Sequence, residues 1–279
     1  MKILFCNEND KDYQYKLNNF LSPIFLDFSF WYNLNLWDSN YESYSIMQNE
    51  EIVSNICIYK ANILFKNRQY MALSVGAVAT KYEHRGKGYA RFIMEHIIEK
   101  YPDMPMYLSA NETVTGFYPR FAFERVIEKL PVAQFKIHND IKARKIRFDN
   151  PVIWNYIYNR INYSSELDCL NTESINLFHI YWGYLHDCIY EIPELKTLIV
   201  ARQNKTVLKI ISVYSLKDIS FQDLANQLPF QHVSLIEFGF MPYWNDLEYE
   251  MRFYDTDPLF VRGIKCELGD FKFPELSIT

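Results

Sequence analysis

The sequence has few glycines and few cysteines for its length. Of 279 residues, 8 are glycine and 5 are cysteine. The cysteines are odd in number, scattered and never in C-x-x-C spacing: Cys6, Cys57, Cys169, Cys188 and Cys266. This pattern predicts free buried thiols in a reducing compartment and argues against a disulfide framework or a zinc site. We therefore expect a cytoplasmic protein without a metal.

The histidines do not suggest a metal either. His179 and His186, with Asp187 beside the second, lie one heptad apart on a helix predicted over roughly 173–186. Metal ligands on a helix favour i, i+4 spacing. We interpret both histidines as satisfied or partly buried side chains.

The sequence also lacks a long apolar run and a basic excess. Its longest nearly uncharged apolar stretches, YMALSVGAVAT and INLFHIYWGYL, are well short of the roughly 20 residues that a membrane span needs. The apolar run in MKILFCNENDKDY is too short for a signal peptide. The net charge is −5 and the pI about 5.7, whereas a nucleic-acid binder normally has a basic face. We expect no membrane and no nucleic-acid partner.

The hydrophobic pattern predicts a mixed α/β first half. Its period changes at Gly88 from that of a buried strand to that of an amphipathic helix, which ends at Tyr101-Pro102. The expected elements are strands over 42–48 and 52–65 joined at Asn49-Glu50-Glu51, a strand over 70–80, the helix from Gly88, a strand over 104–110, a short helix or turn over 113–121, and a closing pair of strands over 124–130 and 132–137.

A polar, charged segment around residues 137–150 is the best candidate for a domain boundary. We expect one domain over residues 1–137 and a smaller α/β domain over residues 138–279. The elements expected in the second are helices opening at Asn150-Pro151, over 173–186 and from Ser220, and strands over 196–203, 206–214, 232–240 and 247–254.

Two segments, one in each half of the chain, have similar sequences, and we call this similarity the sequence echo. QNEEIVSNICIY (48–59) and QNKTVLKIISVY (203–214) match in length, turn position and final tyrosine. Two interpretations stay open: hairpins of this kind recur by chance, or the second half is a degenerate copy of the first.

Two of the scarce glycines, Gly86 and Gly88, flank Lys87 where the predicted third strand gives way to a helix. Glycine is kept where φ must be positive or where a ligand approaches the main chain. A helix N-terminus offers unpaired N–H groups and partial positive charge to an anion. A P-loop does not fit, because no Ser or Thr follows Lys87, and a dinucleotide fingerprint does not fit, because Arg91 stands where its third glycine belongs.

The pattern R-x-x-G-x-A does fit, with Arg85, Gly88 and Ala90. Farther on, SANETVTGFYPRFAF places Asn111 and Tyr118 seven residues apart. With these two motifs, residues 1–136 resemble the GCN5-related N-acetyltransferase (GNAT) superfamily, and in particular the N-terminal domain of two-domain bacterial acetyltransferases. The departures are Ala122 for a glycine and Tyr82 for a proline.

The resemblance implies an α/β (α+β) fold with a mixed, mostly antiparallel sheet flanked by helices, and acetyl-CoA as co-substrate. It implies that the main chain of Val78, Ala79 and Thr80 pairs with pantetheine and that Asn111 hydrogen-bonds the pantetheine arm. It makes Tyr118 the general acid that protonates the departing thiolate. The segment implied to wrap the pyrophosphate is Arg85, Gly86, Lys87, Gly88, Tyr89 and Ala90.

The general base and the acceptor site are less well defined. Glu112 and Glu83 are the carboxylates closest to the motifs, and we interpret His84 as a surface residue. The resemblance places an aromatic patch at the acceptor pocket, although an ordinary core helix explains the patch equally well. The candidate substrate-binding residues in this patch are Trp31, Tyr32 and Trp37, with Asp27 and Asp38 nearby to attract a cationic amine.

We therefore predict an acetyl-CoA-dependent N-acetyltransferase in which a primary amine of a small molecule or peptide attacks the thioester directly. One coenzyme site is expected, because Arg262-Gly263-Ile264-Lys265 lacks a second glycine. Two alternatives remain: a catalytically silent coenzyme-A-binding regulatory or interaction module, and a nucleotide-phosphate binder.

Overall fold

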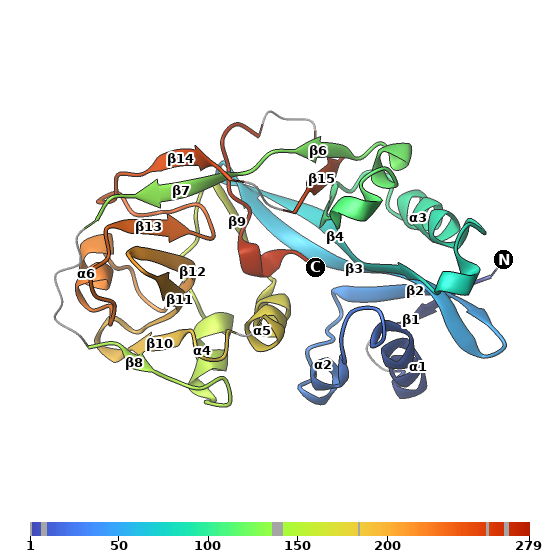
Figure 1. Cartoon of the computed structure of the whole chain (residues 1–279), viewed down its shortest axis with the longest axis horizontal. Helices are drawn as coiled ribbons and strands as arrows, with labels where there is room; N and C mark the ends of the chain where they lie inside the picture. Colours follow the sequence, from blue (N-terminus) through green and yellow to red (C-terminus); the bar gives the residue numbers. More distant parts are fainter. Residues whose placement is uncertain (1, 7–9, 136–141, 184, 255–256, 265–267) are drawn as a thin grey trace.

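The computed structural model describes residues 2–6, 10–135, 142–183, 185–254, 257–264 and 268–279, which form two mixed sheets lying side by side (Figure 1). The first sheet has the order β1 (Ile3–Cys6), β2 (Tyr41–Gln48), β3 (Glu51–Phe65), β4 (Arg68–Thr80), β5 (Met106–Ser109), β15 (Leu259–Arg262) and β6 (Glu124–Val126), with β9 (Leu167–Cys169) paired to β3. Its strands are antiparallel except for β4 and β5.

The second sheet has the order β14 (Glu250–Phe253), β7 (Lys129–Ala133), β13 (Leu235–Phe238), β12 (Val207–Ser215), β11 (Thr197–Asn204), β10 (Ile189–Ile192) and β8 (Arg144–Lys145). Its single parallel pair in the described residues is β12 with β13. The helices are α1 (Lys11–Leu21), α2 (Ser29–Asn33), α3 (Tyr89–Lys100), α4 (Val152–Tyr158), α5 (Glu173–Trp182) and α6 (Phe221–Asn226). The predicted fold class, a mixed and mostly antiparallel sheet with helices plus a second α/β unit, is confirmed.

Helices cover both faces of the first sheet, α1 and α2 on one and α3 on the other (Figure 1). The alternation of side chains along β3 requires this arrangement. Cys57, Tyr59 and Ala61 belong to the core that includes α1, while Ile56 and Ile58 belong to the core that includes α3. Both faces of β3 are apolar, so both must be covered.

Local sequence patterns predicted the positions of most helices and strands in the first half of the chain. The β2–β3 turn falls where it was predicted, with Asn49 and Glu50 at φ of 49° and 64°. The helix that starts after Gly88 ends at Lys100, before Tyr101-Pro102. The helix predicted over 173–186 ends earlier, at Trp182.

The predicted closing pair of strands is wrong. β6 and β7 do not pair with each other; β6 pairs with β15 in the first sheet, and β7 pairs with β13 and β14 in the second. β15 comes from far along the chain and buries Leu259 and Phe260, each 2% exposed, between β5 and β6. Burying these two side chains stabilises the sheet more than direct pairing of β6 with β7 in a local hairpin would.

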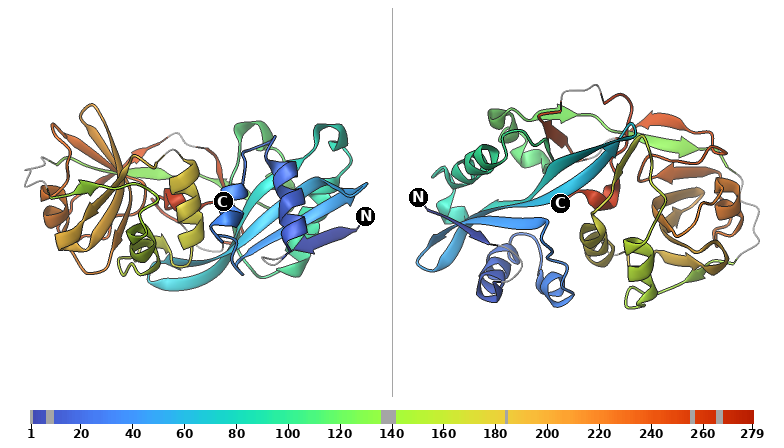
Figure 2. Two further views of the ribbon diagram at one scale, coloured as in Figure 1. Left: turned by 90° about the horizontal axis from the view of Figure 1, so that it is seen from below. Right: turned by 180° about the vertical axis from the view of Figure 1, so that it is seen from behind.

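The domain boundary expected at residues 137 and 138 lies outside the described residues. Sheet membership crosses it in both directions, since β7 precedes it and joins the second sheet, while β9 and β15 follow it and join the first. The views in Figure 2 show α5 and the C-terminal segment (red) lying where the two sheets meet.

The two sheets share one arrangement, a strand, a helix and a parallel strand: β4–α3–β5 in the first and β12–α6–β13 in the second. The sequence echo does not mark equivalent strands in this arrangement. It aligns β2–β3 with β11–β12, whereas the shared arrangement aligns β3–β4 with β11–β12. The echo itself is therefore better explained by chance recurrence.

A buried carboxylate ties α3 to the first sheet. Glu42 on β2 is 7% exposed and accepts hydrogen bonds from Lys60 Nζ at 2.6 Å, Tyr101 Oη at 2.7 Å and the Tyr44 hydroxyl. Lys100 Nζ lies 3.4 Å from the same carboxylate. Burial alone raises the pKa of Glu42, but the hydrogen bonds and the Lys100 charge outweigh it and lower the pKa to about 2.

We predict that Glu42→Gln lowers the free energy of unfolding by about 3 kcal/mol at pH 7, because it leaves two lysines beside a neutral group. The folded-state pKa of Glu42 is below the ordinary value of 4.5. The stabilisation is therefore complete above that pH and is lost as the pH falls towards 2. Urea unfolding of both proteins across this range measures it.

Glu99→Gln, on the exposed face of α3, is the matched control and should leave stability unchanged. A loss in Glu42→Gln that stays constant from pH 7 to pH 2 would contradict the ionic role.

Candidate active site

The loop between β4 and α3 presents unpaired main-chain N–H groups. Gly86 and Gly88 have φ of 75° and 80°, and a Cβ on either would meet no atom within 4 Å. The backbone angle, not crowding, therefore calls for glycine here. Gly88 is the N-cap of α3 without a side-chain cap, and no group in the described residues accepts from the N–H of Tyr89, Ala90 or Arg91.

Two cationic side chains stand beside these N–H groups. Arg85 Nε donates to the Thr80 carbonyl at 3.3 Å, and its guanidinium lies 5.6 Å from the centre of the Tyr82 ring. Lys87 Nζ lies 3.3 Å from Nδ1 of His84. Helix end, arginine and lysine together favour an anion at this loop.

β4 and β5 separate on the approach to this loop. β4 and β5 pair at Leu73 with Met106 and at Ser74 with Tyr107 and then diverge. β5 continues against β15, while β4 bulges against β3, with Ala77 at φ 47°. The edge of β4 that follows Ser74 thus faces an opening.

A buried hydrogen-bond network holds the bulge. Asn55 Nδ2 donates to the Ala77 carbonyl at 3.3 Å. Asn55 Oδ1 accepts from the hydroxyls of Ser43 and Ser45 at 2.8 and 2.7 Å, and Tyr13 Oη lies 2.7 Å from each of these hydroxyls. The network therefore runs from α1 through β2 and β3 to the bulge in β4.

An apolar cavity of about 460 Å³ opens where β4 and β5 separate. Four of the residues singled out in the sequence line it: Val78, Asn111, Tyr118 and Trp31. The other lining residues that matter below had no predicted role in a site. Cys57 was predicted to be a free buried thiol and His179 a satisfied or partly buried side chain, and no prediction was made for Gly76, Phe178, Trp182 and Thr279. Ala79 and Thr80 continue the β4 edge, paired with Asn55 and Ser54 of β3.

Tyr118 reaches this cavity from a 3₁₀-helix, η3 (Tyr118–Phe121). Its side chain is 4% exposed, and burial raises the pKa of its phenol to about 12. No described residue hydrogen-bonds the phenol, so its proton is available to a ligand. Ala122, which stands where the family has glycine, ends η3 at φ 60°, a conformation that favours glycine.

Asn111 and Glu112 open a second 3₁₀-helix, η2 (Glu112–Val114). Asn111 Oδ1 caps it by accepting from the Thr113 N–H at 2.9 Å, which leaves the Asn111 NH₂ group for a ligand. The Glu112 side chain is 64% exposed and lies 3.5 Å from Arg125 Nη2. Glu83 and His84, in the loop before Arg85, line neither cavity described here.

A charged cavity of about 660 Å³ adjoins the apolar one and shares Ser109, His179 and Thr279 with it. Its charged side chains are largely paired. Lys272 Nζ lies 3.1 Å from Glu128 Oε1, and Lys209 Nζ lies 2.7 Å from Glu275 Oε1. Glu112 and Asp257 also line it.

Thr279 lines both cavities, and Ile278 lines the charged one. His179 Nε2 lies 2.6 Å from the Ile278 carbonyl oxygen, and the Thr279 N–H donates to Ser74 Oγ at 3.1 Å. A Cβ on Gly76 would lie 2.8 Å from Thr279 Cβ. A glycine inside a buried strand was the one sequence signal for this close approach.

The three candidate substrate-binding aromatics are placed differently. Trp31, 3% exposed, lines the apolar cavity. Trp37 Nε1 donates to the Tyr41 carbonyl at 3.0 Å, and Tyr32 packs 5.9 Å from the Trp37 ring, so neither lines the cavity. Asp38 accepts from the Tyr59 hydroxyl at 2.9 Å and is thus engaged within the protein.

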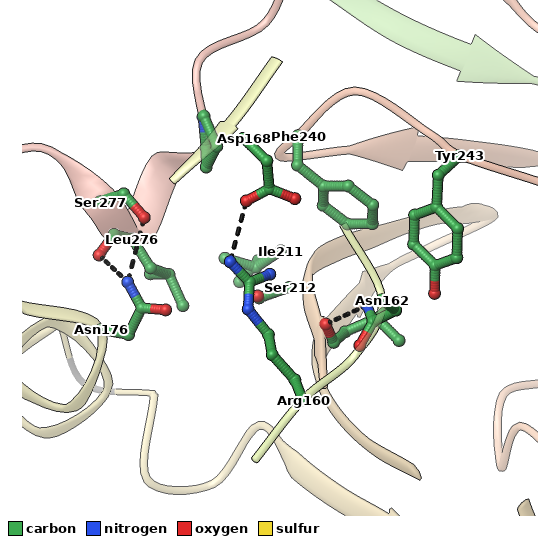
Figure 3. A pocket seen from close by; sticks show the side chains of 12 residues that line it. Arg160, Asn162, Asp168, Asn176, Ile211, Ser212, Phe240, Tyr243, Leu276 and Ser277 are labelled. Carbon is green, nitrogen blue, oxygen red and sulfur yellow. Dashed lines mark hydrogen bonds and ion pairs between the residues drawn. The ribbon is translucent and has the colours of Figure 1, made fainter. Parts of the chain in front are cut away.

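A third cavity, beside the second sheet, is too small for a substrate (Figure 3). It has a volume of about 10 Å³, enough for a single water molecule. Arg160 Nη2 donates to Asp168 Oδ1 at 2.9 Å at its edge. We interpret it as structural.

The described residues lack two features of other protein classes. None of the helices in the described ranges is long and apolar enough to cross a bilayer. Nowhere in that part of the chain do three His, Cys, Asp or Glu side chains gather as a metal site requires.

Residues 26–126 match the family model described as "Acetyltransferase (GNAT) domain". Comparison with curated protein sequences gave no match.

Solved structures similar to this chain extend over nearly all of it. A probable N-acyltransferase from Enterococcus faecalis V583 is 15% identical with a TM-score of 0.58, over 94% of this chain and 72% of its own. Eis1 from Mycobacterium abscessus is 11% identical with a TM-score of 0.57, over 94% and 73%. A GCN5-related N-acetyltransferase from Kribbella flavida is 12% identical with a TM-score of 0.54, over 93% and 70%. At such identities these similarities show the fold.

We predict that Gly88→Ala weakens coenzyme A binding about tenfold, equivalent to about 1.4 kcal/mol. Alanine strains the positive φ and places a methyl group beside the N–H groups of α3. Titration calorimetry with coenzyme A measures the affinity, and thermal melting measures the strain.

Gly269→Ala is the matched control, because Gly269 also has a positive φ, 65°, and open space around it. It should lose similar stability and keep the wild-type affinity. Wild-type affinity in both variants would show that the loop does not bind the coenzyme.

Proposed function

We propose that this protein is an acetyl-CoA-dependent N-acetyltransferase that transfers an acyl group to a primary amine of a small molecule or peptide. The observation that carries the proposal is that the open edge of β4 and the Tyr118 phenol line one cavity. The unpaired N–H groups of α3 lie in the loop that follows β4. The GNAT domain at residues 26–126 supports acyl transfer as the general activity.

The residues present fit coenzyme A. The diphosphate is held by the main chain from Arg85 to Ala90, where two glycines leave the approach open and Arg85 and Lys87 add positive charge. The pantetheine arm follows the main chain of Val78, Ala79 and Thr80. The Asn111 NH₂ group donates to it from the other side of the opening.

The chemistry is direct attack of a neutral amine on the thioester carbonyl, and holding both reactants in one cleft supplies much of the acceleration. Tyr118 donates its proton to the sulfur as the C–S bond breaks. With a pKa of about 12 the phenol stays protonated throughout the neutral range. Transfer to a thiolate, whose conjugate acid has a pKa of about 8.5, is uphill in isolation, so we place it within the bond-breaking step.

We further propose that the domain of residues 1–137 binds the coenzyme and that residues 138–279 complete the acceptor side. α5 and the C-terminal segment supply His179 and Thr279 to the cavities. Trp31 forms part of the wall that receives the acceptor or the acyl group.

We predict that Tyr118→Phe reduces turnover about 100-fold or more, because sulfur loses its proton donor. Affinity for acetyl-CoA should be unchanged, since the ring remains. Thiol release with acetyl-CoA and a panel of amines gives the first quantity, and calorimetry gives the second.

Tyr15→Phe, a tyrosine 68% exposed on α1, controls for loss of a hydroxyl elsewhere. A wild-type protein that binds acetyl-CoA but releases no thiol with any amine would favour the silent binding module. ATP or NAD affinity above that for coenzyme A would favour the nucleotide binder.

A further inference from the structure

His179 stands at the junction of the two large cavities. Ser109, His179 and Thr279 are the residues that line both the apolar and the charged cavity. An acceptor that enters through the charged cavity must pass these residues to reach a thioester held beside Tyr118. Of the three side chains, the imidazole is the one that takes up a proton near neutral pH.

The hydrogen bond of His179 to the C-terminal segment fixes its tautomer. Nε2 lies 2.6 Å from the Ile278 carbonyl oxygen. A carbonyl only accepts, so Nε2 carries the hydrogen and Nδ1 carries the lone pair of the neutral ring. No described residue forms a hydrogen bond with Nδ1. Nδ1 is also absent from the solvent-inaccessible polar atoms that lack a hydrogen-bond partner. It is therefore open to the cavities.

The surroundings keep this ring neutral. Burial lowers the pKa of His179 from its ordinary value, against a smaller opposing effect of the Ile278 carbonyl. The titratable groups that face the ring across the cavities are Tyr41, Cys57 and Tyr118 on the apolar side and Glu112, Glu128, Lys209, Tyr254, Asp257, Lys272 and Glu275 on the charged side.

We propose that Nδ1 of His179 is the general base that accepts the proton of the attacking amine. The proposal rests on the proposed function. Tyr118 lines the same cavity, so an acid and a base face one reaction space from different elements, η3 and α5.

The protons balance. The amine nitrogen bonds to the thioester carbon, which makes its N–H acidic, and His179 Nδ1 accepts that proton. The C–S bond breaks, and Tyr118 protonates the sulfur. The imidazolium then returns a proton to the phenolate through solvent, so that amide and free thiol leave with the enzyme restored.

The carboxylates near the motifs are less suited to this role. Glu112 is 64% exposed, close to Arg125, and lines the charged cavity alone. An exposed carboxylate beside a guanidinium is a weak base. Glu83 lies in the coenzyme loop and lines neither cavity.

The test compares His179→Gln with the wild type. Glutamine keeps an N–H donor for the Ile278 carbonyl but has no basic nitrogen. Thiol release is followed from pH 5 to pH 9 with acetyl-CoA and an aminoglycoside, a polyamine, an amino acid and a short peptide as probes. The wild-type kcat should fall at acid pH with a pKa below about 6.5. In His179→Gln this acid limb, the fall of kcat at acid pH, should disappear, and kcat should be about 10²–10⁴-fold lower than in the wild type. The affinity for acetyl-CoA should be unchanged.

Asn176→Ala is the positioning control, because Asn176 Nδ2 holds the same segment through the Leu276 carbonyl at 2.6 Å. It should keep the acid limb. In His179→Ala, added imidazoles should restore turnover in proportion to their basicity, which a merely structural gap would not show.

The outcomes separate the two proposals. If the wild type turns over and His179→Gln keeps both its kcat and its acid limb, His179 is not the base and the proposed function stands. If the wild type releases no thiol with any probe, the proposed function fails and this inference fails with it.

Discussion

The separation of β4 from β5 is the constraint on which the site depends. Asn55 holds the Ala77 carbonyl in a bulge, and β4 pairs with β5 only at Leu73 and Ser74. Ala77 sits at a φ of 47°, which costs an alanine about 1 kcal/mol, and the buried network from Tyr13 offsets that cost. A regular β4–β5 ladder would close the cleft.

The glycine loop and the two large cavities differ in polarity. The glycine loop is exposed and positive, with Arg85 and Lys87 beside a helix N-terminus. One cavity is apolar and holds the Tyr118 phenol out of water, where a proton donor stabilises a developing charge more strongly. The other cavity is charged, but its lysines and carboxylates largely neutralise one another. Under the proposed function, these environments would receive the diphosphate, the thioester and the amine in turn.

The second half of the chain is part of the site. β15 pairs with the edge of β5 that faces away from β4, and His179 of α5 and Thr279 line both cavities. β7 comes from the first half of the chain and belongs to the second sheet, while β15 comes from the second half and belongs to the first sheet. This exchange of strands ties the two halves together.

The sequence by itself determined the features that depend on residues close together in the chain. The turn at Asn49-Glu50, the stripe of α3 and the loop of Gly86 and Gly88 follow from local backbone preference and periodicity, and all lie where they were predicted. The resemblance to the GNAT superfamily singled out Tyr118 and Asn111, which line the cavity. Only the tertiary structure decided that β6 pairs with β15 and that His179 lines the same cavity as Tyr118. Those contacts join residues more than a hundred positions apart or from separate elements, and their burial energy leaves no periodic trace in the sequence.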